Sequence, residues 1–506
     1  MTMNNTPWKK AFVEVVDQRR EKLPPAWLAT NKTSAPRTER GHEVHESGRE
    51  RVAASTIVAL LRQAAVKVVV SSFLLADKGI EDALLAIAKR GVRVYVLLAS
   101  EARLGKEDSE GEFDKKVLEL HKQMLIRLGG HVLFRSAPHF HAKVVIVDPE
   151  TRPAGILLTA NLTSEALERN EELAIVLTKQ EVVEATAYAK WAMWEAAEHE
   201  LVDPQDRFKA VKPLGKLPHP GPSSALVATT SKTATIRDEA LRLINGARSR
   251  IVVSSFGWDA EHEVVRRLAA RAREGVDVTV IARMRPSSMP ALLALAEAGA
   301  KVVGFRWLHA KAIWTDSGQA MVMSANFQAD GLNHGFELGI RITGNRASEV
   351  LERLDRWAEG SEWRLATAPT LGDASGKVMV WQGGKLVDGE IRPTADVDLG
   401  TVTATSAHEL IAQRPATPNT GSLPRLAHEL RCTWTVVPPL LAPKAKEVPM
   451  PVDGEEKPVS YTPPVFREPS GRLVVAVRSL HELELARARM SELSAAAIVL
   501  AEGAAR

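Results

Sequence analysis

The sequence is poor in cysteine and has no long apolar run. Its one cysteine, Cys432, excludes an internal disulfide framework and fits a reducing compartment. No apolar stretch approaches the roughly 20 residues that a membrane-spanning helix needs. Residues 1–7 lack the layout of a secretory signal, in which a charged segment precedes an apolar one. These absences lead us to expect a soluble, cytoplasmic protein.

The sequence also lacks a strong excess of charge of either sign. It has 66 lysines and arginines against 62 acidic residues, which gives a net charge of +4 and a pI near 9.0. So small an excess does not by itself indicate a nucleic-acid-binding protein, and an anionic partner has to be inferred from local sites. The length of 506 residues suffices for about three to four domains.

Buried strand patterns and helical periodicity alternate from residue 52 onward, which predicts an α/β fold. The expected elements are a helix over 52–65, a strand over 67–75, a helix over 80–89 ended by Gly91, a strand over 92–99, a helix over 114–128 and a strand over 132–135. Two later strands, over 173–178 and 338–342, each lead into a helix. These helices bear Trp191, Trp194 and Trp357, which we expect to pack in the core.

The order of elements begins again near residue 236, so the chain contains an internal repeat. The segment 68–73 returns as 251–256, and Gly91 returns at nearly the same offset as Gly275. A repeat of this length is a duplicated domain. The offset is smaller at the histidines, so the first copy carries an insertion. The acidic segment 101–114 in that region is interpreted as a loop over one mouth of a site or a solvated surface loop.

We therefore predict two pseudo-twofold-related lobes, each a mixed β-sheet flanked by helices, and a C-terminal region with some β-structure. The predicted divisions are an N-terminal arm over 1–51, a first lobe over 52–205, a linker over 206–230, a second lobe over 231–370 and a C-terminal module or tail over 371–506. In the flanking parts we expect a helix over 8–21, a hairpin over 377–391, a strand over 472–477 and a helix over 481–502. The role of 371–506, where a protein partner could bind, does not follow from the sequence, and neither does the oligomeric state.

Two polar constellations with the same internal order are the main functional signal. The first contains His141, Lys143, Asp148, Thr159, Asn161 and Glu172, and the second contains His309, Lys311, Asp316, Ser324, Asn326 and Glu337. In both, Lys follows His by two residues and Asp follows Lys by five, and a Glu comes eleven residues after the Asn. Strand alternation places His and Lys on one face, and Asp on the other face or in the next turn. The aspartates are therefore interpreted as structural residues.

Buried lysines at positions 143 and 311 require an anion, and a bound phosphate supplies one. The Asn amides and the hydroxyls of Thr159 and Ser324 are expected to add donors to this phosphate. One imidazole can then attack phosphorus while the other protonates the leaving alkoxide and later activates water. Glu172 and Glu337 are interpreted as residues that orient the imidazoles. Because the lysines provide positive charge, no metal or other cofactor is expected.

The two constellations resemble the paired HKD motifs, His-x-Lys-x4-Asp, of the phospholipase D superfamily. The resemblance covers about 52–370 and implies two lobes that share one active site. It implies that each orienting acid comes from the opposite lobe, so that Glu337 serves His141 and Glu172 serves His309. It favours His141 as the nucleophile. The usual Gly-Ser before x-Asn is replaced by Leu158-Thr159 and Met323-Ser324, which keep a hydroxyl.

Three residues outside the motifs are further candidates for substrate binding. Arg283 and Arg285 follow a predicted strand at the edge where α/β folds open their ligand crevice, and are expected to contact backbone phosphates. Trp258 follows another strand and could stack a nucleobase, with core packing as the alternative.

The sequence thus predicts a metal-independent phosphodiesterase. The favoured interpretation resembles bacterial HKD-type endonucleases, including those of restriction or phage defence, with DNA as a more expected substrate than RNA. The alternatives are a phospholipase D or phosphatidyltransferase that acts on lipid headgroups, and a non-catalytic scaffold that binds polyanions. The absence of a recognisable membrane-insertion helix disfavours the lipid enzyme. The presence of every expected catalytic residue type twice disfavours the scaffold.

Overall fold

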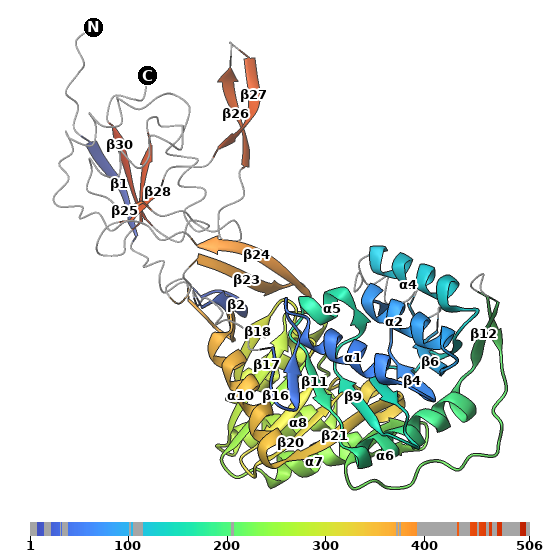
Figure 1. Ribbon diagram of the computed structural model, residues 1–506. Coiled ribbons are helices and arrows are strands. Elements are labelled where there is room, and N and C mark those ends of the chain that lie inside the picture. The colour runs from blue at the N-terminus through green and yellow to red at the C-terminus, as the bar shows by residue number, and fades with distance from the viewer. Residues whose placement is uncertain are drawn as a thin grey trace. The chain divides into compact units, whose positions relative to one another are not determined.

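The computed structural model shows two compact units, one formed by 32–365 and the other by 1–31 together with 366–506 (Figure 1). The structure describes residues 8–14, 22–30, 32, 39–100, 103–104, 115–203, 207–370, 373, 376–391, 433–434, 446–452, 455–461, 465–467, 473–477 and 496–501. Most of the acidic segment 101–114 and the proline-rich parts of the C-terminal region lie outside these residues.

The first lobe of the larger unit is built on a mixed sheet with the strand order β13-β12-β7-β6-β4-β8-β9-β11-β3. In that order its strands are Arg207–Ala210, His199–Asp203, Leu133–Ala137, Arg93–Ala99, Lys67–Ser71, Val144–Val147, Ala154–Leu158, Leu173–Val176 and Val44–Glu46. Strands β4, β6 and β7 are parallel, whereas β8 runs antiparallel to β4. The adjacent helices are α1 (Val52–Gln63), α2 (Lys78–Lys89), α4 (Lys115–Leu128), α5 (Ser164–Glu168) and α6 (Lys179–Trp191), which continues as the π-helix η2 (Ala192–Ala196).

The second lobe repeats this arrangement with the order β15-β14-β21-β20-β19-β16-β17-β18-β22. Its strands are Thr233–Ala234, Leu226–Thr230, Glu337–Thr343, Gln319–Met323, Ala312–Thr315, Arg250–Ser255, Asp277–Arg283, Lys301–Phe305 and Trp363–Ala366. Its helices are α7 (Thr235–Gly246), α8 (Glu263–Arg273), η3 (Pro286–Ser288), α9 (Met289–Glu297), η4 (Asp330–His334) and α10 (Gly344–Gly360). The run β7-β6-β4-β8-β9-β11 corresponds to β18-β17-β16-β19-β20-β21, so the predicted duplication and fold class are confirmed.

Local sequence explains why the elements begin and end in the same places in both lobes. Gly91 and Gly275, which follow α2 and α8, both have φ +89°, a left-handed conformation that glycine adopts without a steric penalty. The side chain of Asp77 caps α2 by accepting a hydrogen bond from Ile80 N. β4 and β16 are runs of buried β-branched residues, as expected for strands covered on both faces.

One buried core joins the two lobes. On one face of the first sheet, α1, α2 and α4 pack over a cluster that includes Ile57, Leu84 and Leu125 (Figure 1). The other face belongs to a core that continues into the second lobe and includes Trp191 of α6 and Trp357 of α10, which pack as predicted. Trp194 lies at the edge of this core, where the guanidinium carbon of Arg135 is 4.3 Å from its ring centroid.

Several expectations outside the repeated elements are wrong. Residues 8–14 of the predicted helix over 8–21 form strand β1 (Trp8–Glu14), and 496–501 of the predicted helix over 481–502 form β30 (Ala496–Ala501), its antiparallel partner. A short apolar segment does not distinguish a helix from a strand by periodicity alone.

The predicted hairpin is present as β23 (Gly376–Gln382) and β24 (Lys385–Ile391). A strand is present where expected near the C-terminus, β29 (Leu473–Val477).

The remaining strands of the smaller unit are short. They are β2 (Ala26–Ala29), β25 (Thr433–Trp434), β26 (Lys446–Val452), β27 (Glu455–Tyr461) and β28 (Val465–Arg467). β26 pairs with β27, and β28 joins β29, which is parallel to β30.

Candidate active site

The two His-x-Lys segments lie at equivalent places, immediately before β8 and β19. Lys143 and Lys311 are among the largest fully buried side chains, with 1% and 0% of their surface exposed. Each ammonium donates a 2.5 Å hydrogen bond to the backbone carbonyl of the histidine two residues earlier. Burial lowers the pKa of Lys311 well below its usual value, with Glu172 opposing the shift. Burial of the charged lysines therefore costs desolvation free energy, and a bound anion would offset this cost.

Backbone contacts between the lobes place each histidine beside the glutamate of the other lobe. The amides of His141 and Ala142 both donate to the carbonyl of Phe336, at 3.1 and 3.0 Å. In the related contact, the amides of His309 and Ala310 donate to the carbonyl of Glu171, at 3.0 and 2.8 Å. Glu337 follows Phe336, and Glu172 follows Glu171, so this exchange of hydrogen bonds brings each carboxylate to the opposite histidine.

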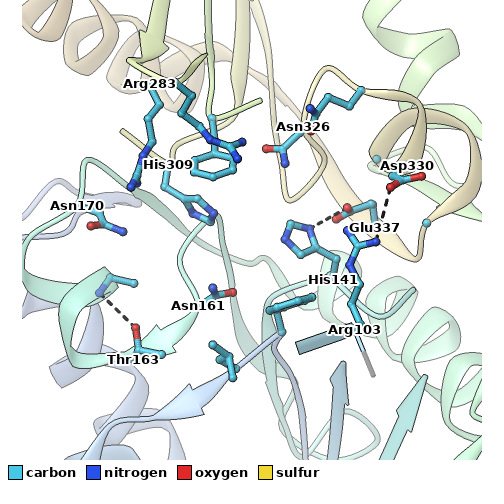
Figure 2. Close-up of a pocket in the computed structure, with 18 of the residues that line it drawn as sticks. Arg103, His141, Asn161, Thr163, Asn170, Arg283, His309, Asn326, Asp330 and Glu337 are labelled. Carbon is cyan, nitrogen blue, oxygen red and sulfur yellow. Dashed lines mark hydrogen bonds and ion pairs between the residues drawn. The ribbon is translucent and has the colours of Figure 1, made fainter. Parts of the chain in front are cut away.

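Both histidines consequently contact a carboxylate through Nδ1, in the pairing that the resemblance implies. His141 Nδ1 is hydrogen-bonded to Glu337 Oε1 at 2.8 Å (Figure 2). His309 Nδ1 lies 2.8 Å from Glu172 Oε1. The second contact is shared, because Lys311 Nζ is also 2.9 Å from His309 Nδ1. With Nδ1 occupied, Nε2 is the ring nitrogen of each histidine that remains for chemistry.

The electrostatic environment differs between the two histidines. Burial lowers the pKa of His141 to about 4, although the Glu337 carboxylate opposes the shift. Burial and the charges of Lys311 and Lys143 lower the pKa of His309 well below its usual value. Both imidazoles are therefore neutral near pH 7 while no anion is bound, as a nucleophilic nitrogen must be.

The two carboxyl groups also differ in their pKa. Burial alone would raise the pKa of Glu337, but the interaction with His141, the Lys143 charge and the hydrogen bond from Ser324 lower it below the usual value. For Glu172, burial raises the pKa by more than the Lys311 charge and the hydrogen bond from Thr159 lower it, so its pKa lies above the usual value. Glu337 is thus the more firmly ionised of the two orienting groups.

The hydroxyls of Thr159 and Ser324, which were predicted to bind substrate, contact the two orienting glutamates, and neither residue lines the cavity. Both residues are fully buried. Thr159 Oγ1 donates to Glu172 Oε2 at 2.6 Å, and Ser324 Oγ donates to Glu337 Oε2. Each hydroxyl also accepts a backbone amide of the strand that follows the glutamate, from Leu173 at 2.9 Å and Leu338 at 3.1 Å. They hold the carboxylates in place beside the histidines.

The two motif aspartates lie away from the reacting groups. Asp148 accepts the backbone amides of Ala65, Val66 and Lys67 at 2.8 to 2.9 Å, and so fixes the turn between α1 and β4. Asp316 accepts the amides of Arg248 and Ser249 in the equivalent turn before β16. These contacts agree with their interpretation as structural residues.

The histidines open into one cavity of about 520 Å³ that both lobes line. Figure 2 shows the rings of His141 and His309 next to each other, with Asn161 and Asn326 on opposite sides of the pair. The Oδ1 atoms of both asparagines are buried and have no hydrogen-bond partner among the described residues. Since an unsatisfied buried amide is costly, both side chains are suited to bind a polar group that enters the cavity.

The residues predicted around the motifs divide between the cavity and the core. Arg283 and Arg285 line the cavity, whereas Trp258 does not. Trp258 is only 1% exposed, its ring packs against Phe327, and its indole N–H donates to Ser255 O at 3.0 Å. It is therefore a packing residue and is not available to stack a nucleobase.

Sequence reasoning missed two residues at the cavity rim, Trp307 and Arg169. The Trp307 side chain is 39% exposed, and the guanidinium carbon of Arg169 lies 3.8 Å from its ring centroid. Their positions in the sequence could have indicated a place near the site, because Trp307 precedes His309 by two residues and Arg169 precedes Glu172 by three.

The described residues show neither a cluster of metal-binding side chains nor a membrane-spanning helix. They contain no group of three or more His, Cys, Asp or Glu side chains arranged to hold a metal ion. Within the same residues, no helix combines the length and apolar character required to cross a membrane.

Comparison with known proteins identifies the family. Residues 57–194 and 240–359 match the family model described as the cardiolipin synthase, PLD-like domain. These segments make up just over half of the chain and contain both constellations, so the chain belongs to the phospholipase D superfamily. Members of this superfamily are phosphodiesterases and phosphotransferases, and phosphodiesterase-type chemistry is the activity that membership supports.

Solved structures similar to this chain have diverse activities. A polyphosphate kinase from Porphyromonas gingivalis has 16% identity and a TM-score of 0.42 over 63% of this chain, which spans about half (51%) of the kinase. A phosphatidylserine synthase from Haemophilus influenzae Rd KW20 has 11% identity and a TM-score of 0.45, with 68% of this chain and 90% of the synthase covered. Nuc, a phospholipase D family member from Salmonella typhimurium, has 23% identity and a TM-score of 0.25, with coverages of 28% and 97%.

No curated protein matches the chain. The specific activity is therefore inferred from its own site.

Proposed function

We propose that the chain is a metal-independent nuclease that cleaves phosphodiester bonds of nucleic acid through a phosphohistidine. The proposal rests chiefly on two imidazoles in one cavity, each in contact through Nδ1 with a glutamate of the other lobe. Two buried lysines beside them can neutralise the phosphate and the charge that develops in the transition state. The positive charge that a divalent metal supplies in many nucleases then comes from the protein.

The proposed reaction has two displacements at phosphorus. His141 Nε2 attacks, the bond from phosphorus to the leaving oxygen breaks, and His309 gives that oxygen its Nε2 proton. His309 then takes a proton from water, whose oxygen attacks phosphorus as the bond to His141 breaks. The bound phosphate anion raises the pKa of His309, which lets this imidazole carry the proton required for the first step.

Asn161 and Asn326 are proposed to donate hydrogen bonds from Nδ2 to the non-bridging oxygens of the phosphate. Glu337 and Glu172 fix the tautomer and orientation of the two imidazoles, and Ser324 and Thr159 position the carboxylates. All of these groups lie on rigid strand ends or are held by backbone contacts between the lobes, which suits a site that must keep its geometry during two displacements.

The rim favours nucleic acid among the possible phosphodiesters. Arg103, Arg169, Arg283 and Arg285 line the cavity together with the exposed ring of Trp307. Guanidinium groups suit the repeated phosphates of a polynucleotide, and an exposed aromatic ring suits its bases. We further propose DNA ahead of RNA as the substrate and a role in restriction or phage defence, as the resemblance to HKD-type endonucleases implies.

A second candidate function is phosphatidyl transfer between lipids. It is favoured by the family model, whose description names cardiolipin synthase. The same histidines would then form a phosphatidyl-histidine, and an alcohol of a second lipid would take the place of water.

The purified chain, incubated in EDTA with single-stranded DNA, duplex DNA, RNA and phosphatidylglycerol vesicles in parallel, tests the proposal. We expect cleavage of nucleic acid at an undiminished rate in EDTA and no new lipid product. His141→Ala and His309→Ala should each lower the rate at least about 10³-fold, because neither imidazole can perform both tasks.

The outcomes separate the candidate functions. Lipid products without nucleic acid cleavage would favour the transferase. Binding of nucleic acid with no turnover in any arm would favour a non-catalytic scaffold. Complete loss of cleavage in EDTA would contradict the metal-independent reaction.

A further inference from the structure

Three arginines at the cavity rim are ordered by two aromatic rings. The guanidinium carbon of Arg169 lies 3.8 Å from the ring centroid of Trp307, and that of Arg283 lies 5.1 Å from the same centroid. Arg283 is also 5.1 Å from the ring of Phe256, and Arg285 is 4.2 Å from it. We call these five residues the arginine ladder. Contacts of this type are worth about 0.5–2 kcal/mol each and restrict the long arginine side chains to one region of the rim.

The arginine ladder begins at the reacting groups and leads away from them. The ring of Phe256 packs edge-on against His309, with a centroid distance of 5.0 Å. Figure 2 shows Arg283 directly beside His309 in the cavity. At the other end of the arginine ladder, Arg169 and Trp307 are both exposed to solvent. A phosphate bound between the two histidines would thus have the arginine ladder on the His309 side.

The other half of the rim, related by the pseudo-twofold axis, keeps one ring, because Phe73 packs edge-on against His141 at 5.4 Å as Phe256 does against His309. The residues around that ring differ. Arg283 ends β17, and the residue that ends β6 is Ala99, which is buried against Phe73. The counterpart of Trp307, two residues before the catalytic histidine, is His139. The counterpart of Arg169, three residues before the orienting glutamate, is His334.

The arginine near the His141 half is matched by an acid. Arg103 forms an ion pair with Asp330 at 3.7 Å, and both residues line the cavity (Figure 2). Apart from Asp330 and the orienting Glu337, the described residues that line the cavity include one acid, Glu165, against the three guanidinium groups of the arginine ladder. Among the described residues that line the cavity, three of the four arginines therefore belong to the His309 half.

This asymmetry matters because the inner site is nearly symmetric while a nucleic acid strand has a direction. Two histidines, two lysines, two asparagines and two glutamates related by a twofold axis would accept a strand equally well in either direction. The phosphates that flank the scissile phosphate are bound outside the symmetric residues, so only the rim can distinguish the two directions.

We propose that the arginine ladder binds the phosphate adjacent to the scissile phosphate and thereby admits the nucleic acid strand in one direction. This inference rests on the nuclease function proposed above. The strand segment beyond the leaving oxygen lies on the His309 side, over Phe256 and Trp307. Every cleavage then leaves the phosphate on the same side of the break.

The test compares a substrate that has neighbouring phosphates with one that has none. The double variant Arg169→Ala/Arg285→Ala spares Arg283, whose charge acts on His309. Its kcat/KM should fall at least tenfold more for a single-stranded oligodeoxynucleotide than for bis(p-nitrophenyl) phosphate, which has a single phosphate. The slope of log kcat/KM against log salt concentration for the oligonucleotide should become shallower by about 0.7, the value for one phosphate that is no longer neutralised.

Product ends provide a second measurement. We expect the wild-type protein to leave the phosphate uniformly on one side of the break, and the double variant to give both kinds of end. Arg266→Ala is the control. This substitution on α8 also removes a positive charge, but the Arg266 side chain is 62% exposed and does not line the cavity.

An equal loss on both substrates, or uniform ends in the double variant, would overturn the inference while leaving the nuclease function intact. A wild-type protein that hydrolyses bis(p-nitrophenyl) phosphate but no oligonucleotide would instead contradict the proposed function itself.

Discussion

The two lobes are alike at the phosphate and unlike at the rim. Each lobe contributes one His, one Lys, one Asn and one Glu from equivalent strand ends, and each Glu contacts the histidine of the other lobe. A few ångströms outward, Arg283 corresponds to Ala99 and Trp307 to His139. The shared residues lie where we propose that the phosphate binds, and the two non-bridging oxygens of a phosphodiester are themselves equivalent. The divergent residues lie where its two substituents, which differ from each other, are proposed to bind.

The lobes also differ in the contacts and pKa values of the histidines and glutamates that face the cavity. The contact between His141 and Glu337 has hydrogen-bond geometry, and Glu337 has a lowered pKa. On the other side, Lys311 competes for His309 Nδ1, and the pKa of Glu172 is raised. A carboxylate that is firmly ionised stabilises the positive charge on an imidazole whose Nε2 becomes phosphorylated. The difference supports His141 as the nucleophile and His309 as the group that moves protons.

The largest expected difference between the lobes is which histidine becomes phosphorylated. With bis(p-nitrophenyl) phosphate, whose leaving group needs no acid, His309→Asn should release one equivalent of p-nitrophenolate and then stop. His141 would attack, and without His309 no base would activate water. Intact mass spectrometry should show the added p-nitrophenyl phosphoryl group. His141→Asn should give neither the burst nor the adduct.

The reverse pattern would exchange the roles of the two lobes. Absence of a burst in both variants, with the wild-type protein active, would rule out a covalent intermediate on either histidine. The wild-type protein under the same conditions serves as the control for active-site concentration.

A smaller difference is expected between Glu337→Gln and Glu172→Gln. Loss of the ionised Glu337 should lower kcat by about 10²- to 10⁴-fold, because the tautomer and charge of His141 depend on it. Loss of Glu172 should cost less, about tenfold, since Lys311 also contacts His309 Nδ1. Glu261→Gln, with a side chain that is 88% exposed, is the control.

The pH dependence adds a test of direction. The neutral form of His141 attacks, so kcat/KM rises as pH increases through the pKa of His141, which burial lowers to about 4. The acidic limb is therefore expected near pH 4 and not near 6.5. The Glu337 carboxylate raises this pKa, so the limb should move to lower pH in Glu337→Gln and stay in place in Glu172→Gln. A shift to higher pH in Glu337→Gln would contradict the assigned contact.

Much of the inner site could be predicted from the sequence because the duplication repeats its spacing. Alternation predicted the lysines on a buried face and the aspartates elsewhere. Both lysines are buried, although they precede β8 and β19, and both aspartates accept backbone amides of turns. The contact of each glutamate with the opposite histidine did not follow from spacing. It depends on backbone hydrogen bonds between segments of different lobes, which lie far apart in the sequence, and only the family resemblance implied it.

Errors arose where a side chain has two possible environments. Thr159 precedes Glu172 by thirteen residues, and pairing of β9 with β11 turns its hydroxyl toward that carboxylate and away from the cavity. Trp258 follows a strand at the expected edge, but its counterpart in the first lobe is Leu75, a buried residue. Comparison of the two copies would have indicated core packing. The same comparison would have drawn attention to Trp307, because an exposed tryptophan replaces His139.

The smallest expected difference between the lobes concerns stability and the two motif aspartates. Asp148 is 1% exposed and accepts three backbone amides, whereas Asp316 is half-buried. Asp148→Asn turns an amide N–H toward a backbone donor and should lower the free energy of unfolding by about 2 kcal/mol, against about 1 kcal/mol for Asp316→Asn. Urea denaturation at pH 7 measures both values.

The pH dependence of this stability difference identifies its cause. Backbone donors lower the pKa of Asp148 against the effect of burial, so its contribution is complete above the unfolded pKa, near 3.8, and is lost as pH falls through the folded pKa. The gap between wild type and Asp148→Asn should therefore be largest at pH 7 and narrow below pH 4. Each variant should keep near-normal kcat per folded molecule. An Asp148→Asn protein of unchanged stability but without activity would contradict the structural role. It would show that this carboxylate, and not only the His, Lys, Asn and Glu residues, takes part in the reaction.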